Sequence, residues 1–228
     1  MFLFMQTIKY SGVRAQFLEE FNPKKYDKVS FLCGLEQILA EDSSPRYLVD
    51  SSPISGALGT NIENRHFLRA NKEELREWFK AVPFVVAHPT LAELFGMLTY
   101  SKEILNKGDY QIRDLPSLLN RRNCCFFVDP IIGDKNLKRA LSQYAPADTI
   151  EKLERYVFDK KISRNDARLI AIALRTKSLR GKLKLFTFDV PAMDVAAIVG
   201  APYVDLGSCP ELPYDLVLHR TPQSRQAS

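Results

Sequence analysis

The sequence predicts an α/β fold in which helices cover a mainly parallel sheet. Short apolar segments at residues 47–49, 84–87 and 183–188 alternate with longer segments of helical periodicity. Strands separated by helices form βαβ units, and such units build parallel sheets. Of the 228 residues, 46% are hydrophobic and 26% are charged, which is ordinary for a packed globular chain and excludes disorder throughout.

The individual elements follow from apolar patterning and from the turn residues between them. The first is a helix over Val29–Ala40, which ends in the acidic, Ser-rich loop 41–45. The expected strands are Tyr47–Val49, Phe84–Ala87, Cys124–Val128 (a strand or a buried helix end), Leu183–Phe188 and Tyr203–Leu206. The further helices are Asn71–Ala81, Leu91–Tyr100, Leu115–Arg121, Lys135–Tyr144, Asp148–Lys160, Asp166–Thr176 and Met193–Val199.

Proline and glycine fix several of these boundaries. Pro83 ends the helix over Asn71–Ala81, because a proline cannot continue a helix. Pro89 suits the first turn of the helix that follows. Gly200 ends the last helix, since glycine is favoured just past a helix end.

The chain is expected to divide into three parts. Residues 1–45 form an N-terminal helical extension, and residues 46–208 form the main domain, with an enlarged helical region at 101–162. Residues 209–228 form a polar tail, which is expected to be disordered from Thr221 onward.

Charge and cysteine usage limit the classes of protein. The net charge is +5 and the pI is near 9.0, which favours a polyanionic partner. Cys124 and Cys125 are adjacent while Cys33 and Cys209 stand alone, a spacing that suits neither a zinc site nor a disulfide framework. Reduced thiols in a cytoplasmic protein are the expectation.

No segment is expected to enter a membrane. No apolar run approaches the ~18–20 residues that a spanning helix needs. The apolar start, Met1 to Met5, lacks the basic residues of a secretory signal and is too short for one.

Four acids fall where an α/β sheet places its functional groups, beyond the carboxyl ends of strands. Asp50 follows the first predicted strand of the main domain, Glu93 lies just beyond the second, and Asp189 ends a later one. Asp50 and Asp189 could equally be turn or cap residues. Glu93 points away from the apolar face of its helix, so a solvated side chain is the alternative for it.

Asp166 is the most informative of the four acids. With Ser163 it fits a capping box at the start of a helix. It also shares a helical face with Leu169, Ile170 and Ala173, and a carboxylate that heads a buried stripe must pair, cap or bind a cation. Capping and metal binding both remain open for this residue.

Taken together, the four acids indicate a metal site. Like charges that converge on one cleft repel strongly unless a cation binds or their pKa values rise. Oxygen ligands without His or Cys select a hard ion, Mg²⁺ or Mn²⁺. Such an ion suits phosphodiester hydrolysis, because it generates hydroxide and neutralises charge in the transition state.

Several segments resemble the motifs of PIN-domain nucleases, including toxin-like members, over about residues 47–207. They are YLVDSS (47–52), VVAHPTLAEL (85–94), NDARLIAIAL (165–174), LFTFD (185–189) and GAPYVD (200–205). The third is the most specific match. The chain departs from the family in its extension at 1–45, in the length of 101–162, and at Phe188, where a polar residue is common.

The resemblance implies a three-layer α/β/α PIN-like fold and an RNA-cleaving activity. It implies that Asp50, Glu93, Asp166 and Asp189 are the catalytic and metal-binding residues. Ser51 or Ser52 would match the small polar residue beside the first acid, and Thr187 the hydroxyl residue before the last; these three are assigned to substrate binding. A homodimer and a neutralising or regulatory protein partner are also implied.

A basic segment is the candidate for binding the nucleic acid, RNA or else DNA. Arg175, Lys177, Arg180, Lys182 and Lys184 fall within ten residues that contain no acid. They form either a solvated helix end, where the helix dipole favours cations, or a phosphate-contacting rim beside the cleft. Arg121, Arg122, Lys135, Lys138 and Arg139 are weaker candidates.

The sequence thus predicts a Mg²⁺- or Mn²⁺-dependent endoribonuclease. One alternative is a PIN-fold scaffold that binds nucleic acid or protein without cutting. Another is a metal-dependent phosphatase with Asp50 as nucleophile, against which the missing Asp two residues later counts. No phosphate-binding glycine loop or zinc-protease helix motif appears.

Overall fold

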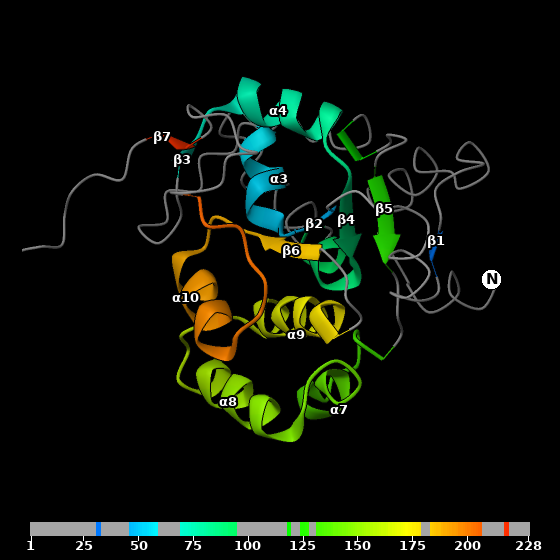
Figure 1. Cartoon of the computed structure of the whole chain (residues 1–228), viewed down its shortest axis with the longest axis vertical. Coiled ribbons are helices and arrows are strands. Elements are labelled where there is room, and N and C mark those ends of the chain that lie inside the picture. The colour runs from blue at the N-terminus through cyan, green and yellow to red at the C-terminus, as the bar shows by residue number, and fades with distance from the viewer. Residues whose placement is uncertain are drawn as a thin grey trace, which may run out of the picture.

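A parallel sheet forms the centre of the fold. The computed structural model of the chain describes residues 31–32, 46–58, 69–94, 118–119, 124–127, 131–178, 183–206 and 217–218. Within these residues, five strands form a parallel sheet in the order β1-β5-β4-β2-β6 (Figure 1). They are β1 (Phe31–Leu32), β2 (Arg46–Val49), β4 (Phe84–Ala87), β5 (Cys124–Phe127) and β6 (Leu183–Phe186). A separate antiparallel pair joins β3 (Arg69–Ala70) to β7 (Val217–Leu218).

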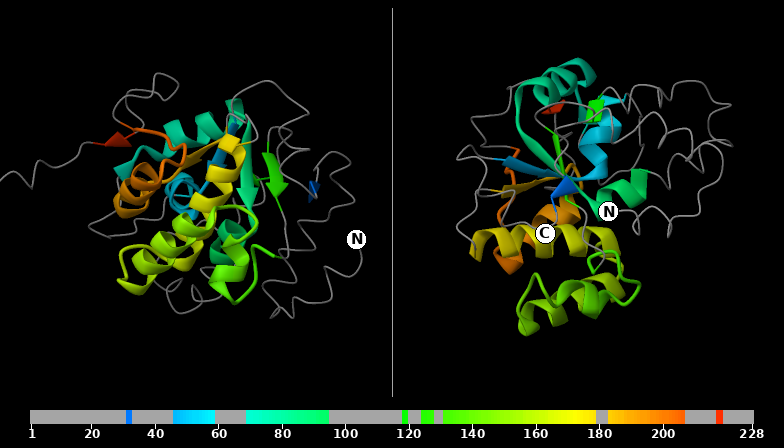
Figure 2. Two further views of the ribbon diagram at one scale, coloured as in Figure 1. Left: turned by 60° about the horizontal axis from the view of Figure 1, so that its bottom comes forward. Right: turned by 90° about the vertical axis from the view of Figure 1, so that its right-hand side faces the viewer.

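Helices cover both faces of the sheet. The described helices are α3 (Ser51–Ala57), α4 (Lys72–Ala81), residues 88–94, α7 (Leu137–Leu141), α8 (Ala147–Phe158), α9 (Arg164–Ser178) and α10 (Val190–Val199). Figures 1 and 2 show α3 and α4 on one face, and α9 and α10 on the other with α7 and α8 packed beyond α9. The predicted α/β class, with a parallel sheet and helices on it, is confirmed.

Side-chain alternation along the strands explains why both faces need a helical layer. Leu48 and Val85 pack into the cluster formed with α7, α8, α9 and α10. Their neighbours Val49 and Val86 pack into the cluster formed with α3 and α4. All of β4 is buried, as expected for a central parallel strand, which reads as a continuous apolar run.

Aromatic rings fill the core on the α3 and α4 side. Trp78 is 3% exposed, and its ring centroid lies 4.7 Å from that of Phe186 and 5.2 Å from that of Tyr47. Phe188 continues the group, 5.4 Å from Phe186 in an edge-on arrangement. Such edge-to-face contacts add to the gain from burying each ring.

The local signals for helix ends hold in the structure. The side chain of Asn71 caps α4 by accepting hydrogen bonds from the backbone N–H groups of Glu73 and Glu74. Gly200 ends α10 in the left-handed region with φ of 75°, a conformation that costs glycine little.

Three predicted elements differ from the structure. The helix over Val29–Ala40 is wrong at Phe31–Leu32, which form the edge strand β1; a short apolar run fits either element, and here pairing to β5 decides it. The strand at Tyr203–Leu206 is reduced to a single parallel bridge between Tyr203 and Leu185, next to Pro202, which has no N–H to donate. The strand at Leu183–Phe188 ends at Phe186, because the chain then turns to start α10.

The structure also adds elements that the sequence did not predict. The segment after Asp50, for which no helix was predicted, forms α3, and Asp50 is its N-cap, one of the two alternatives given for this residue. β1 lies inside the predicted extension 1–45 and β7 inside the predicted tail 209–228, and both pair with other strands. The tail from Thr221, residues 95–100, most of Leu115–Arg121 and the rest of Val29–Ala40 lie outside the described residues.

The predictions about membrane segments and about the cysteines can be compared with the structure. Among the described residues, no helix combines the length and apolar character needed to cross a bilayer. Cys124 carries a buried free thiol, as expected.

The aromatic core predicts a stability difference between two phenylalanines. Phe186→Ala should lower the free energy of unfolding by about 3–5 kcal/mol, because it removes a fully buried ring and leaves a cavity. Phe158→Ala makes the same chemical change on a ring that is 85% exposed, and should change stability by only ~0.5 kcal/mol. Urea unfolding followed by circular dichroism measures both, and equal losses would contradict this assignment of the core.

Candidate active site

Three of the four acids follow neighbouring parallel strands. Asp50 comes directly after β2, Glu93 lies in the helical residues 88–94 after β4, and Asp189 follows β6 as the N-cap residue of α10. Because β2 pairs in parallel with both β4 and β6, the carboxyl ends of these strands lie at one edge of the sheet, called here the acidic edge. The fourth acid, Asp166, comes from the first turn of α9.

Asp50 is the most enclosed of the acids and is held by hydroxyl groups. Its side chain is 3% exposed. Oδ2 accepts hydrogen bonds from the hydroxyls of Ser52 and Thr187, both at 2.8 Å, and caps α3 by accepting from the backbone N–H of Ser52 at 3.5 Å. These donors offset the cost of burying the charge.

The hydroxyl oxygens of Ser52 and Thr187 also accept hydrogen bonds from the backbone. Ser52 Oγ accepts from the backbone N–H of Phe188 at 3.0 Å, and Thr187 Oγ1 accepts from that of Asp189 at 3.1 Å. Each hydroxyl therefore gives its proton to Asp50. Ser52 and Thr187 are buried, so the structure places both as supports of Asp50; their predicted contact with substrate stays a prediction.

Glu93 is held by donors from two different elements. Ser51 Oγ donates to Oε2 at 2.6 Å, and Asn165 Nδ2 donates to Oε1 at 2.9 Å. Thr90, three residues earlier in the same helix, donates its hydroxyl to the carbonyl of Val49 at 2.9 Å. Thr90 thereby ties the helix that carries Glu93 to the residue before Asp50.

Asp166 forms the predicted capping box. Its Oδ2 accepts from the backbone N–H of Ser163 at 2.7 Å, and Ser163 Oγ accepts from the backbone N–H of Asp166 at 3.0 Å. The side chain is nevertheless only 7% exposed. The capping box thus explains the contact of Oδ2, while the Asp166 side chain as a whole is buried.

Asp189 does not take the capping role that was its alternative. Its side chain makes no capping hydrogen bond to α10, whose second residue, Pro191, has no N–H to offer. The carboxylate is half-buried and its charge acts on Glu93.

The four acids interact electrostatically. Burial first, and then the charges of Asp50 and Glu93, raise the pKa of Asp166 from 3.8 to about 8, against hydrogen bonds from Ser163 that lower it. Burial, and then Asp50 and Asp189, raise the pKa of Glu93 from 4.5 to about 6. Each acid is therefore within electrostatic reach of at least one other at this edge.

The four acids and their neighbouring hydroxyl groups are of the residue types that bind a hard cation, but the acids do not lie close enough together to hold one. The donors are carboxylate and hydroxyl oxygens, which Mg²⁺ and Mn²⁺ prefer, and a cation would relieve their repulsion. As the side chains lie, no three His, Cys, Asp or Glu among the described residues gather closely enough to hold a metal ion. Movement of the carboxylates toward one another would be needed to bind one.

The described residues of the basic segment lie toward the other end of their elements from the acids, and their predicted role in binding nucleic acid stays a prediction. Arg175 and Lys177 lie in the last turn of α9, and Lys177 is eleven residues, about 16 Å, along that helix from Asp166. Lys184 lies near the start of β6, at the other end of that strand from Thr187. Arg180 and Lys182 are outside the described residues.

The reason is that a helix and a strand each carry the chain across the sheet, so residues close in sequence lie at opposite edges. Lys177 instead donates Nζ to the carbonyl of Gly200 at 3.1 Å, at the C-terminal end of α10. A cation at a helix C-terminus is the alternative that the sequence left open for this segment.

Two further residues at the acidic edge were not singled out from the sequence. Asn165 donates to Glu93, and Arg168 donates Nη1 to the Asn165 Oδ1 at 2.9 Å. Both lie in the segment 165–174 that resembles the third PIN motif, one turn apart on α9. Their position beside Asp166 on an exposed helix start was the available signal.

No family model matches this sequence, and no curated protein matches it either. The resemblance to PIN-domain nucleases therefore rests on the motifs themselves and on the site described above.

The raised pKa values predict that the chain without cation loses stability as pH rises. In the unfolded chain the Asp166 carboxyl titrates at 3.8 and in the folded chain at about 8, so the folded state holds the proton more tightly between these values. The resulting stabilisation is complete below pH 3.8 and is lost as pH rises through about 8. Glu93 adds a smaller loss between 4.5 and about 6.

Urea unfolding in chelator across this pH range tests the prediction. The free energy of unfolding should fall by up to about 1.4 kcal/mol per pH unit, and Asp166→Asn should flatten that slope. Asp194→Asn, on the exposed face of α10, is the control and should leave the slope unchanged. A wild-type curve that rises with pH over this range would refute the assignment.

Proposed function

We propose that this chain is a PIN-like endoribonuclease that hydrolyses RNA phosphodiester bonds with Mg²⁺ or Mn²⁺. The observation that carries the proposal is the set of four acids, Asp50, Glu93, Asp166 and Asp189, which act on one another at the carboxyl edge of a parallel sheet. Carboxylates with purely structural roles are normally kept apart, because their charges repel. A cation-binding site instead requires several carboxylates close together, and the bound cation offsets their repulsion.

The layering of the fold supports the proposal. A parallel sheet with α3 and α4 on one face and α9 and α10 on the other is compatible with the three-layer α/β/α arrangement that the PIN resemblance implies (Figure 1). The four acids occur in the family order along the chain.

The protein's own contribution would be to hold the acids in place. Ser52 and Thr187 orient Asp50, and Ser51 and Asn165 orient Glu93. Asp166 is held by the backbone N–H of Ser163, which donates to its Oδ2, and burial raises its pKa to about 8. Asp50, Glu93, Asp166 and Asp189 would hold the cation, which when bound supplies a hydroxide nucleophile and charge neutralisation.

A second candidate function has an observation in its favour. Asp50 caps α3 and Asp166 caps α9, and no three acids among the described residues gather at one point. These features are also compatible with a scaffold that binds nucleic acid or protein without cutting. DNA as the target, homodimer formation and a neutralising partner remain proposals that rest on the resemblance alone.

Cleavage by an Asp166 variant distinguishes the two functions. Asn caps a helix about as well as Asp, so Asp166→Asn should fold. If the residue is a metal ligand, the variant should lose RNA cleavage by two or more orders of magnitude, because a neutral amide is a poor ligand for a hard cation. The assay is cleavage of a mixed RNA pool with Mn²⁺ and, in parallel, with chelator.

The matched control is Asp194→Asn, the same change at an exposed position on α10, which should retain full activity. Cleavage by wild type that persists in chelator would exclude the metal mechanism. Full activity of Asp166→Asn would remove that residue from the site and favour the scaffold.

Mn²⁺ should also stabilise the wild-type protein. A ligand at 100 times its Kd adds about 2.7 kcal/mol, which raises the Tm of a chain of this size by roughly 5–10 °C. Glu93→Gln should abolish most of the rise while preserving the fold, since the Ser51 hydroxyl can rotate to accept from the new amide.

Thermal unfolding with and without Mn²⁺ measures the effect. Glu151→Gln, an exposed change on α8, is the control and should keep the full rise. An equal rise in Tm for Glu93→Gln and wild type would place the bound cation elsewhere.

A further inference from the structure

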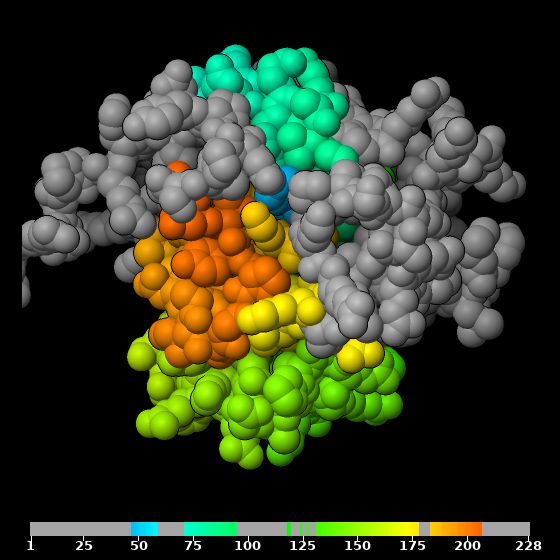
Figure 3. All heavy atoms as spheres, viewed as in Figure 1, coloured from blue at the N-terminus to red at the C-terminus, as the bar shows by residue number. Residues whose placement is uncertain are grey.

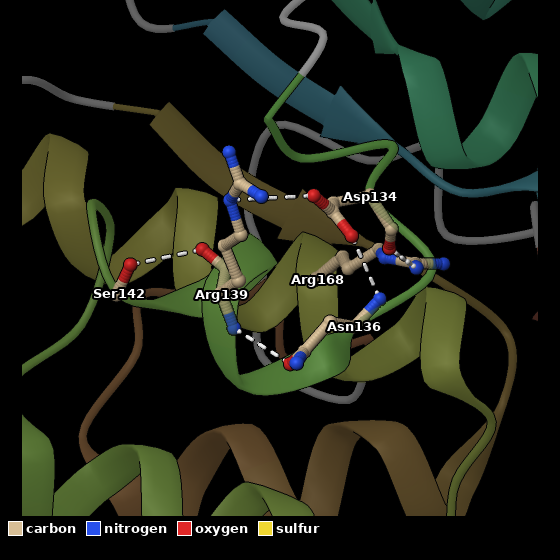
Figure 4. Close-up of polar contacts among 5 residues, drawn as sticks. All are labelled: Asp134, Asn136, Arg139, Ser142 and Arg168. Atoms are coloured by element: carbon tan, nitrogen blue, oxygen red, sulfur yellow. Dashed lines mark hydrogen bonds and ion pairs between the residues drawn. The ribbon is translucent and has the colours of Figure 1, made fainter.

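Three arginines contact one dipeptide, Asp134–Lys135, two of them through its backbone carbonyls and one through the Asp134 carboxylate. Arg168 donates Nη2 to the carbonyl of Asp134 at 2.6 Å, and Arg164 donates Nη1 to the carbonyl of Lys135 at 3.4 Å. Arg139 pairs its Nε with the Asp134 carboxylate at 3.4 Å. Figure 4 shows Arg139 and Arg168 approaching Asp134 from different sides, one from α7 and the other from α9.

The contacts of this group leave its positive charge largely uncompensated. Asp134 supplies a carboxylate to Arg139, whereas the oxygens that Arg164 and Arg168 contact are neutral carbonyl and amide groups. Lys135, Arg139 and Arg164 are exposed.

The same group is joined to the acidic edge by two hydrogen bonds. Arg168 donates to Asn165 Oδ1 at 2.9 Å, and Asn165 Nδ2 donates to Glu93 Oε1 at 2.9 Å. Because a guanidinium can only donate, it turns the amide oxygen of Asn165 toward itself and the amide nitrogen toward Glu93. A ligand held by Arg168 would therefore lie beside the proposed cleavage site.

Space around the dipeptide is also restricted. A Cβ added to Gly133 would lie 2.7 Å from the ring of His88, so the turn before Asp134 packs directly on the first residue of the helix that carries Glu93. The loop that gathers the arginines and the helix that carries Glu93 are thus in contact.

We propose that Lys135, Arg139, Arg164 and Arg168 form the surface that binds the phosphodiester backbone of a single-stranded RNA substrate. Guanidinium groups suit phosphate because their paired N–H donors match its oxygens. Arg168 uses one N–H group of each terminal nitrogen in the contacts above, while its Nε is buried. This inference rests on the proposed function. It moves the RNA-binding role from the segment around Lys177, at the opposite edge, to the arginine group.

Figure 3 shows the end of the molecule to which α7 belongs. α7 and α8 form one end of the molecule, and α10 lies next to α8 on the face shown (Figure 3). Lys152 on α8 and Lys177 at the end of α9 are both exposed and belong to other parts of the surface. They provide a control that removes equal charge.

Binding of a labelled single-stranded RNA oligonucleotide in chelator, where no cleavage occurs, tests the proposal. Lys135→Gln with Arg164→Gln should weaken binding at least tenfold and reduce the slope of log K against log salt by about 0.7 for each phosphate that the variant no longer neutralises. Lys152→Gln with Lys177→Gln removes the same charge and should leave the slope unchanged. Equal weakening in the two double variants would overturn the proposal, because binding would then follow net charge alone.

A single variant tests the role of the guanidinium itself. Arg168→Lys keeps the charge and removes the forked donors, so it should weaken RNA binding several-fold with little change in salt slope. Unchanged affinity would exclude Arg168 from the surface. Displacement of RNA by poly-glutamate at equal charge would also overturn the proposal, in favour of an acidic protein partner.

The outcome is separable from that of the proposed function. RNA that binds through the arginine group in chelator but is not cut with Mn²⁺ would reject the nuclease and keep the surface. If the wild type cuts RNA while the double variant at Lys135 and Arg164 binds RNA normally, the nuclease would stand and the proposed surface would be rejected.

Discussion

Hydrogen bonds to the buried Asp50 carboxylate join the ends of β2 and β6, two of the three strands that carry the site. Ser52 follows β2 and Thr187 follows β6, and both give their hydroxyl protons to the same oxygen. The backbone N–H groups of Phe188 and Asp189 in turn donate to those hydroxyls, so the charge is satisfied through the start of α10. Burying a carboxylate without such donors would cost several kcal/mol. The packing of α3 and α10 at this edge of the sheet therefore depends on the network.

The other acids are arranged around that network, and their structural and chemical roles overlap. Asp50 and Asp166 lie at helix N-termini, where backbone N–H groups and the helix dipole favour negative charge. This placement makes it possible to hold several carboxylates close together in the folded chain. It does not remove the cost of burial or the repulsion between them: burial first, and then the neighbouring carboxylates, raise the pKa values of Glu93 and Asp166. A helix-capping carboxylate and a metal ligand can therefore occupy the same position. They differ in that only the metal ligand needs its negative charge, because an uncharged Asn also caps a helix.

Charge of the opposite sign is distributed by the same geometry. Lys177, at the C-terminal end of α9, contacts the last carbonyl of α10, while Arg164 and Arg168, at the N-terminal end of α9, gather on the loop before α7. One helix thus presents basic residues at both edges of the sheet, and only those of its first turns lie beside the acids. Asn165 connects the two kinds of charge, because its amide can donate to Glu93 and accept from Arg168 at once.

The sequence by itself determined the secondary structure that local rules control. Asn71 and Pro83 predicted the limits of α4, the apolar run 84–87 predicted the strand β4, and Gly200 predicted the end of α10. Ser163 and Asp166 predicted their capping box, since its partners are three residues apart. These features depend on short-range periodicity and on hydrogen bonds within one turn of the chain.

Only the tertiary structure decided which distant residues meet. Strand pairing set the contact of Thr187 with Asp50, and helix packing set that of Asn165 with Glu93, across 137 and 72 residues of sequence. Lys184 adjoins the last acid in sequence, yet β6 carries the chain along the sheet between Lys184 and Asp189. Proximity at a sheet edge depends on strand order and direction, and neither is encoded in local periodicity.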